Sequence, residues 1–254
     1  MEILICIPEQ EIGRVAVLSA PNVKVVVTTC RGQVAQRAYG LKLALYPYVL
    51  QMDDDITLKS DTLLSLCQAL ELIGPRTAIS PSYRHCRTWA SMAVYKKGVK
   101  GFLQNCVATV ICGAHWGIGR MGTVAPCGTA YGIDPELCND HDSVAVEWLP
   151  GGCVLCFKQD LVTENYFPFP GKAYCEDVIH SVLWRRNGVS LFVLPKIDCY
   201  IDDVIAIDDS RAIKADYRAR KYLVALNGGS QWRCFLYNTL YAVKMQIGKL
   251  RQKT

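Results

Sequence analysis

The stretch Tyr48–Ser65, with the sequence YVLQMDDDITLKSDTLLS, decides the fold. Its first five residues form an apolar run that leads directly into Asp53, Asp54 and Asp55. A periodic apolar segment follows, so the stretch predicts a buried strand, an acidic loop and a helix. Carboxylates just past the carboxyl end of a strand lie where open α/β sheets bind ligands.

Three adjacent carboxylates repel one another unless water or a cation neutralises them. Hard oxygen ligands of this kind suit Mg²⁺ or Mn²⁺. The other interpretation is a solvated acidic turn that caps the following helix. The triplet alone does not decide between these two interpretations.

The composition of the 254 residues is that of a globular protein, with 51% hydrophobic and 20% charged residues. No segment has the length and apolarity of a membrane-spanning helix, and the N-terminus is too short and too acidic for a secretory signal. We therefore expect a cytoplasmic protein. The 13 cysteines are odd in number and scattered, which favours buried reduced thiols over a disulfide framework.

The charge is unevenly distributed along the chain. Residues 211–254 hold ten basic residues and one acidic residue, a net charge of +9, so the remainder carries −4 of the total of +5. We expect a domain over 1–210 and a basic helical extension over 211–254. An acidic body with a basic tail indicates an anionic partner surface, either lipid or nucleic acid.

The last segment, 231–253, predicts a basic amphipathic helix with Trp and Phe on its apolar face. Such a helix suits the inner face of a membrane, and we expect no nucleic-acid partner. The alternative is packing of this face onto the chain's own core or onto a second subunit.

Strands and helices alternate on either side of the acidic stretch. Strands are predicted at 3–7, 23–29, 153–157 and 190–194, and helices at 32–45, 62–73 and 176–186. This alternation predicts an α/β fold with a mostly parallel central sheet flanked by helices.

The middle of the chain, about 78–148, has no clear period. Gly101–Gly119 carries no formal charge, and we expect buried sheet and loop there. The middle also has apolar runs at Val107–Cys112 and Val144–Trp148, and we expect it to hold an antiparallel edge and long loops over the site. Gly117–Gly122 matches G-x-G-x-x-G, but the glycines and the proline that follow exclude the helix of a dinucleotide site.

Two further motifs follow the middle segment. Trp148-Leu-Pro-Gly151-Gly152 leads into an apolar strand, and its glycines permit either close approach of a ligand or a tight bend. Glu176 and Asp177 open a helix, where acidic residues are also ordinary helix punctuation. His180, one turn later, is expected on the helix surface.

The order of these motifs resembles the family 2 glycosyltransferases of GT-A fold. That family has an apolar strand ending in D-x-D, then an aromatic-x-x-Gly-Gly stretch, then a Glu-Asp pair that opens a helix. The segment 32–41, GQVAQRAYGL, is similar to the family's helix before the D-x-D. The resemblance covers about residues 3–200.

The resemblance implies a metal-dependent, inverting transfer of a sugar from a nucleotide-sugar donor. Asp177 would be the general base with Glu176 beside it, and Asp55 with Asp53 would hold Mn²⁺ or Mg²⁺. The remaining implied roles are donor binding by Gln33, Arg37, Asp53 and Asp54, and acceptor binding by Trp148, Gly151 and Gly152. The acceptor would be a glycan or a lipid-linked glycan in cell-surface polysaccharide synthesis.

The chain departs from the family pattern in two places. The usual first strand, which ends in Pro-Thr-Tyr-Asn, has no match, so we expect either a truncated start or a branch without this unit. The late His metal ligand also has no clear match, and Asp198, Asp202 or Asp203 are the alternatives.

Two other functions compete with the transferase. A Mg²⁺-dependent nucleotidyltransferase would also use a strand-end aspartate, but it should carry a Gly-rich phosphate loop with a basic residue near its N-terminus, and none is seen. A degenerate relative could retain the fold and bind glycan or lipid without catalysis. Stabilisation by UDP with Mn²⁺ would favour an intact donor pocket.

Overall fold

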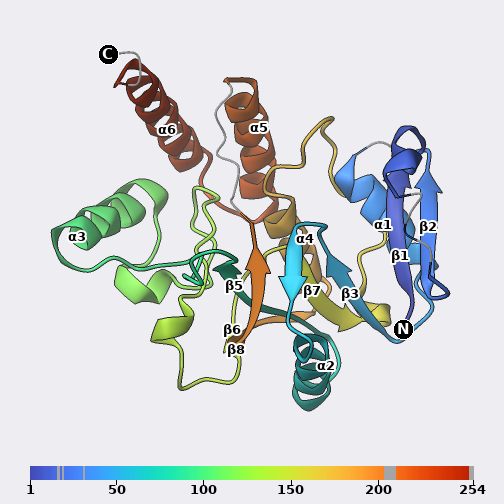
Figure 1. Cartoon of the computed structure of the whole chain (residues 1–254). Coiled ribbons are helices and arrows are strands. Elements are labelled where there is room, and N and C mark those ends of the chain that lie inside the picture. Colours follow the sequence, from blue (N-terminus) through green and yellow to red (C-terminus); the bar gives the residue numbers. More distant parts are fainter. Residues whose placement is uncertain (16–17, 19, 31, 203–209, 252–254) are drawn as a thin grey trace.

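The computed structural model describes residues 1–15, 18, 20–30, 32–202 and 210–251 (Figure 1). Its main sheet has six strands in the order β3-β7-β5-β8-β4, and β6 pairs with β8. The strands are β3 (Tyr48–Met52), β4 (Ile56–Leu58), β5 (Thr77–His85), β6 (Val144–Ala145), β7 (Cys153–Phe157) and β8 (Ser190–Ile201).

The sheet is mixed, so the prediction of a mostly parallel sheet is wrong in this respect. Only β5 and β8 pair in parallel, whereas β7 is antiparallel to both β3 and β5, and β8 is antiparallel to β4 and β6. Strands β3, β5 and β8 nevertheless run in the same direction, because β7 reverses the direction twice between β3 and β5. Their carboxyl ends therefore meet at one edge of the sheet.

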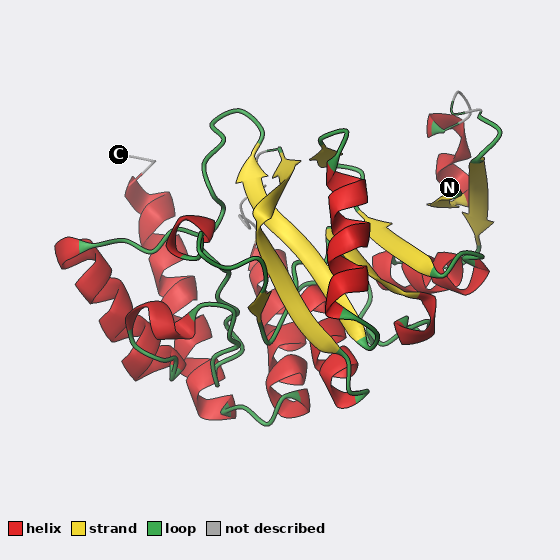
Figure 2. Cartoon of the chain, turned by 90° about the horizontal axis from the view of Figure 1, so that it is seen from below, coloured by secondary structure: helices red, strands yellow, loops and turns green. Residues whose placement is uncertain are grey.

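Helices cover both faces of the sheet (Figure 2). On one face, Leu66 of α2 (Thr62–Ile73) packs in a cluster with Ile79 and Leu155. On the other face, Trp184 of α4 (Glu176–Arg186) packs with Ala78. Because neighbouring residues of a strand point to opposite faces, the continuous apolar runs of β5 and β7 supply both clusters. Cys153, Cys156 and Cys199 are buried in these two clusters, as expected for core thiols.

The N-terminal unit consists of β1 (Ile3–Pro8), a 3₁₀ turn (Glu9–Arg14), β2 (Val23–Thr28) and α1 (Gln33–Leu43). β1 and β2 pair in parallel in a separate two-stranded sheet. Helix α1 lies very close to β1, since a Cβ added to Gly40 would stand 2.2 Å from Cys6 Sγ. The glycine therefore permits this contact.

The part of the middle segment around Gly101–Gly119 is largely helical, so the expectation of buried sheet and loop there is wrong. It contains α3 (Gly98–Cys106), a π-helical turn η2 (Val107–Cys112) and a 3₁₀ turn η3 (Gly117–Arg120). The apolar residues of this uncharged stretch are largely exposed, which is why apolarity alone misled the prediction. Of the two apolar runs, Val107–Cys112 is helical, whereas Val144–Ala145 forms β6, which pairs antiparallel with β8.

Two helices end the described chain, α5 (Ser210–Leu226) and α6 (Gln231–Arg251). Ala219 and Leu223 of α5 pack in one buried cluster with Ile179 of α4. The domain boundary near residue 210 remains a prediction. Among the described residues, none of the helices combines the length and the apolarity needed to traverse a bilayer.

Candidate active site

A cavity of about 520 Å³ opens at the sheet edge where β3, β5 and β8 end. It brings together the two acidic centres, which lie more than a hundred residues apart in the chain. The predicted site residues on its wall are Gln33, Asp53, Asp55, Trp148, Gly151, Gly152, Glu176 and Asp177. Arg37 and Asp54, the two other predicted residues, are not part of this wall.

Gly151 and Gly152 run between the two acidic centres. A Cβ on Gly151 would lie 3.2 Å from both Asp177 Cβ and Glu176 Oε1, and a Cβ on Gly152 would lie 3.4 Å from Asp53 Oδ2. The backbone amide of Asp53 donates to the Gly152 carbonyl at 2.8 Å. Because these glycines have no side chains, the end of β3 and the start of α4 can both lie close to the backbone of residues 151–152. This packing role is separate from the predicted acceptor contact.

Arg37 joins the two acidic centres without lining the cavity. Its guanidinium donates to Glu176 Oε1 at 2.7 Å and to Asp53 Oδ1 at 3.0 Å, and only 10% of its side chain is exposed. Burial lowers the pKa of Arg37, but the charge of Glu176 and its hydrogen bond, together with Asp53, raise it above its ordinary value. This ion-pair network fixes the relative position of the two carboxylates.

Both carboxylate oxygens of Glu176 have protein partners. Oε1 accepts from Arg37, and Oε2 accepts from the Tyr166 hydroxyl at 2.9 Å. The residue is also buried. Glu176 is therefore held as an anchor, which fits a positioning partner better than a group that exchanges protons with a substrate. Sequence reasoning missed Tyr166, because it lies in a loop with no motif around it.

Asp177, the next residue, is partly exposed at the cavity wall. Desolvation and the charge of Glu176 raise the pKa of Asp177 to about 7, although the Val178 amide, which donates to Oδ1 at 2.8 Å, opposes this shift. A carboxylate with a pKa near neutrality is suited to accept a proton. The preceding residue, Cys175, has a φ of +55°, a left-handed conformation that costs a non-glycine residue on the order of 1 kcal/mol.

The aspartate triplet is divided between three environments. Asp53 is half-buried, and desolvation raises its pKa while Arg37 opposes the shift. Asp55 is exposed on the cavity wall, and Asp54 is exposed outside it. Donor binding by Asp54 therefore receives no support from this geometry.

Asp53 and Asp55 present the oxygen donors that Mg²⁺ and Mn²⁺ prefer. Among the residues that the structure describes, no group of three or more His, Cys, Asp or Glu side chains is gathered for a metal ion. Mg²⁺ at nucleotide sites is usually held by one or two carboxylates together with substrate phosphates. The pair therefore fits a cation that binds with a diphosphate, rather than a metal held by protein ligands alone.

The candidates for a further metal ligand lie away from the cavity wall or outside the described residues. Asp198 accepts from Arg84 Nε at 2.8 Å, and Asp202 accepts from Cys86 Sγ at 2.6 Å. Asp203 lies outside the residues that the structure describes.

His180 is buried, so its predicted place on the helix surface is wrong. Its ring stacks on Trp184 with centroids 3.7 Å apart, and burial lowers the pKa of His180 to about 3. It is therefore a neutral core residue behind the Glu-Asp pair.

Aromatic side chains also line the cavity. Trp148 lines it and donates through Nε1 to the Tyr131 carbonyl at 3.0 Å. Tyr83, which sequence reasoning did not single out, also lines the cavity and donates to the Pro150 carbonyl at 3.3 Å. Aromatic rings with fixed orientation suit contact with a sugar, so the prediction of an acceptor role for Trp148 is retained.

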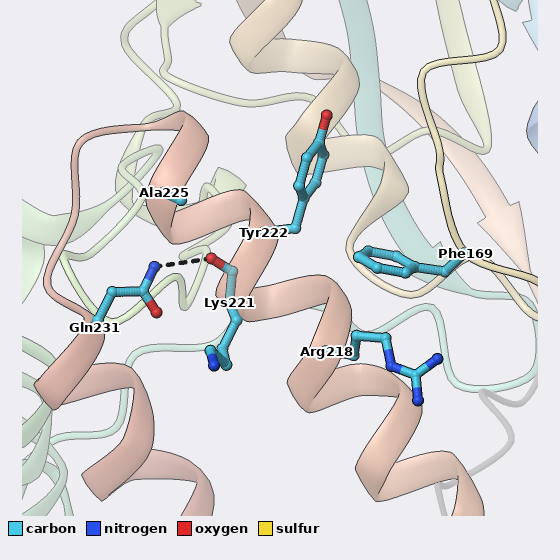
Figure 3. Close-up of a pocket in the computed structure, with 6 residues that line it drawn as sticks. All are labelled: Phe169, Arg218, Lys221, Tyr222, Ala225 and Gln231. Carbon is cyan, nitrogen blue, oxygen red and sulfur yellow. Dashed lines mark hydrogen bonds between the residues drawn. The ribbon is translucent and has the colours of Figure 1, made fainter.

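A second cavity, of about 500 Å³, lies on α5 (Figure 3). In the close-up, Arg218 lies beside the Phe169 ring, and Gln231 donates to the Lys221 carbonyl at 2.9 Å, which links α6 to α5. No carboxylate is among the six residues that line it, and it holds none of the predicted site residues. The acidic cavity is therefore the better candidate for the active site.

Comparison with known proteins supports the fold. No protein-family profile matches the sequence, and no curated protein matches it. Among solved structures, the chain is similar in fold to the crystal structure of GalNAc-T7 with UDP, GalNAc and Mn²⁺, a glycosyltransferase of GT-A fold, with a TM-score of 0.50 and 12% sequence identity. The match covers 83% of this chain but 39% of that one, and it shows the fold alone.

Proposed function

We propose that this protein is a metal-dependent glycosyltransferase that uses a nucleotide-sugar donor. The observation that carries the proposal is the single cavity in which Asp53 and Asp55 face the same space as Asp177. A divalent cation can neutralise the departing nucleoside diphosphate and a general base can deprotonate the acceptor, so the cavity holds side chains suited to both parts of the displacement. The similarity of the fold to a structure that contains UDP, GalNAc and Mn²⁺ is consistent with this chemistry.

The cation, when bound, would neutralise the charge that develops on the departing diphosphate. Asp53 and Asp55 are the residues that would hold it, and Gln33 lies on the same wall for contact with the donor. Arg37 keeps Asp53 in place through its ion pair and does not reach the cavity itself.

Asp177 would accept the proton of the acceptor hydroxyl. Its pKa of about 7 leaves a substantial fraction ionised at neutral pH and also makes the carboxylate basic enough to accept a proton. The acceptor oxygen then attacks the anomeric carbon from the side opposite the diphosphate, so the configuration inverts. Glu176, held by Arg37 and Tyr166, would keep Asp177 oriented. Its negative charge would also keep the pKa of Asp177 raised.

The order of motifs along the chain supports membership of family 2. We further propose an acceptor that is a glycan or a lipid-linked glycan in cell-surface polysaccharide synthesis, and a cytoplasmic location with contact to the inner face of the membrane through 231–253. The basic, apolar character of α6 supports that contact.

The test is a screen of nucleotide-sugars for Mn²⁺-dependent hydrolysis or transfer, with Asp55→Ala and Asp177→Asn as paired variants. We expect at least one donor to be turned over, with a loss of about 10²-fold or more in each variant. Undiminished turnover in either variant would contradict the assigned roles. Mn²⁺-dependent nucleotide binding without any turnover would instead favour the non-catalytic binding relative.

A further inference from the structure

Many exposed apolar side chains lie on α3 with the turns after it, and on α6. Twelve large apolar residues there are at least 46% exposed, and we call them the apolar face. They are Val99, Phe102, Leu103, Val107, Val110, Trp116 and Ile118 in the first segment, and Trp232, Phe235, Leu240, Val243 and Ile247 in α6. Apolar residues in such density mark an interaction surface rather than ordinary solvent-exposed surface.

The two segments that carry the apolar face contact each other. Arg233 of α6 donates to the carbonyl of Val110 and, at 3.2 Å, to that of Ile111. Tyr237 of α6 packs against the buried side of η2, where Ala108 and Cys112 lie. Figures 1 and 2 both place α3 and α6 at the same end of the molecule, opposite β1 and β2.

The segment that carries the first part is firmly anchored at its base. Arg120 is buried, donates to the Gly117 carbonyl at 3.1 Å and to Asn105, and lies 4.9 Å and 5.2 Å from the ring centres of Tyr95 and Tyr131. On the outside, the rings of Phe102 and Trp116 meet edge to face at 5.6 Å. The fold therefore holds these apolar side chains outward in a defined arrangement.

Within the two segments that carry the apolar face, the charge is of one sign. Residues 96–120 and 231–251 contain no Asp or Glu, and the exposed Lys96, Lys97, Lys100 and Lys244 lie beside the apolar residues. A second copy of the chain would bring like charges together, whereas an anionic lipid surface complements both the lysines and the apolar side chains. Trp and Phe are also suited to the lipid–water interface.

We propose that α3 and η2 form, together with α6, a two-part docking surface for a membrane that contains anionic lipid. The proposal adds a second, non-terminal element to the expected contact of 231–253. Residues of the cavity wall adjoin the α3 segment in the chain, Met92 and Ala93 before it and Gly122 after it, so docking would tether part of that wall to the membrane, where a lipid-linked acceptor is present.

Flotation with vesicles tests the proposal with the full chain. We expect binding to phosphatidylcholine vesicles that contain about 30% phosphatidylglycerol, which gives a strongly negative surface. Binding should be weaker without phosphatidylglycerol or at high salt. Phe102→Ser with Val110→Ser should reduce the partition coefficient about tenfold or more. Leu64→Ser with Leu72→Ser, on the equally exposed face of α2, is the matched control and should bind as the unmodified chain does.

Three results would overturn the proposal. One is the absence of binding to both kinds of vesicle. Another is full binding by the Phe102/Val110 variant while Trp232→Ser with Phe235→Ser abolishes it, which would restrict the contact to α6. The third is a dimer in solution that the Phe102/Val110 variant disrupts, without vesicle binding, which would make the face a contact between two copies. Thermal unfolding of each variant verifies that the fold is retained.

Discussion

Replacing Asp177 by Asn is expected to stabilise the folded chain at and above neutral pH while it lowers transfer about 10²-fold or more. Burial and Glu176 raise the pKa of Asp177 to about 7, whereas an aspartate in an unfolded chain has a pKa of about 3.9. Between these two values the folded state holds a proton that the unfolded state has released. The stability of the folded state therefore falls as the pH rises from about 4 to about 7, and this loss is complete above about 7.

The size of the effect follows from the difference of about three pKa units, which corresponds to about 4 kcal/mol at most. Asp177 keeps part of its surface at the cavity, so we expect a gain of about 2 to 4 kcal/mol for Asp177→Asn at pH 8. The amide oxygen can still accept the hydrogen bond of the Val178 amide. For a chain of this size the gain corresponds to an increase in Tm of about 4 to 16 °C.

Urea unfolding at pH 5 and pH 8 measures the effect directly. At pH 5 the gain should shrink to roughly 1.5 kcal/mol or less, because much of the ionisation penalty has disappeared. Asp54→Asn, at an exposed position outside the cavity, is the control and should change stability by less than about 0.5 kcal/mol at either pH. Equal stability of Asp177→Asn and the unmodified chain at pH 8, or the same gain at both pH values, would refute the reasoning.

Three further predictions concern the groups around the Glu-Asp pair. Arg37→Met leaves two carboxylates without their buried partner, so we expect a loss of about 3 to 5 kcal/mol in the free energy of unfolding by urea; a loss under about 1 kcal/mol would contradict the bridging role. Gly151→Ala places a Cβ 3.2 Å from the Asp177 Cβ and should lower kcat about tenfold or more, while Gly13→Ala, with open space around it, should leave kcat unchanged. Tyr166→Phe removes one hydrogen bond to a charged carboxylate and should cost about 1.5 to 3 kcal/mol in unfolding free energy, and an unchanged urea midpoint would argue against that bond.

The elements with strong local patterns could be predicted from the sequence. The bounds of β3, α2, β7 and α4 are those expected, because each is an apolar run or periodic segment between clear stop signals. The location of the acidic loop at the carboxyl edge of the sheet also follows from this pattern. The directions of the strands could not be predicted from the sequence. The position of β7 between β3 and β5 depends on contacts between residues that are far apart in the chain.

The middle segment shows a second limit of sequence reasoning. An uncharged apolar stretch is expected to be buried, yet Phe102, Leu103 and Val110 are exposed. The usual relation between apolarity and burial fails where a surface is built to meet another apolar partner. In this respect the failed prediction and the proposed membrane face have the same physical origin.

The candidate site could be predicted as a set of residues but not as a network. The acidic pairs are visible as motifs, whereas the ion pair between Arg37 and Glu176 joins residues 139 positions apart. Tyr166 and the buried His180 gave no local signal either, since an isolated tyrosine or histidine has the same appearance in a loop, on a surface or in a core. The distinction between Glu176 as the anchor and Asp177 as the base therefore required the structure.

The most direct test of the central claim is calorimetric titration of the chain with a panel of nucleoside diphosphates, with and without Mn²⁺. The claim is that the cavity with Asp55 and Asp177 on its wall is a nucleotide-sugar site. It predicts that at least one nucleotide binds, that binding requires the cation, and that Asp55→Ala abolishes it while Asp177→Asn retains it. Failure of every nucleotide to bind with Mn²⁺ present, or unchanged binding by Asp55→Ala, would contradict it.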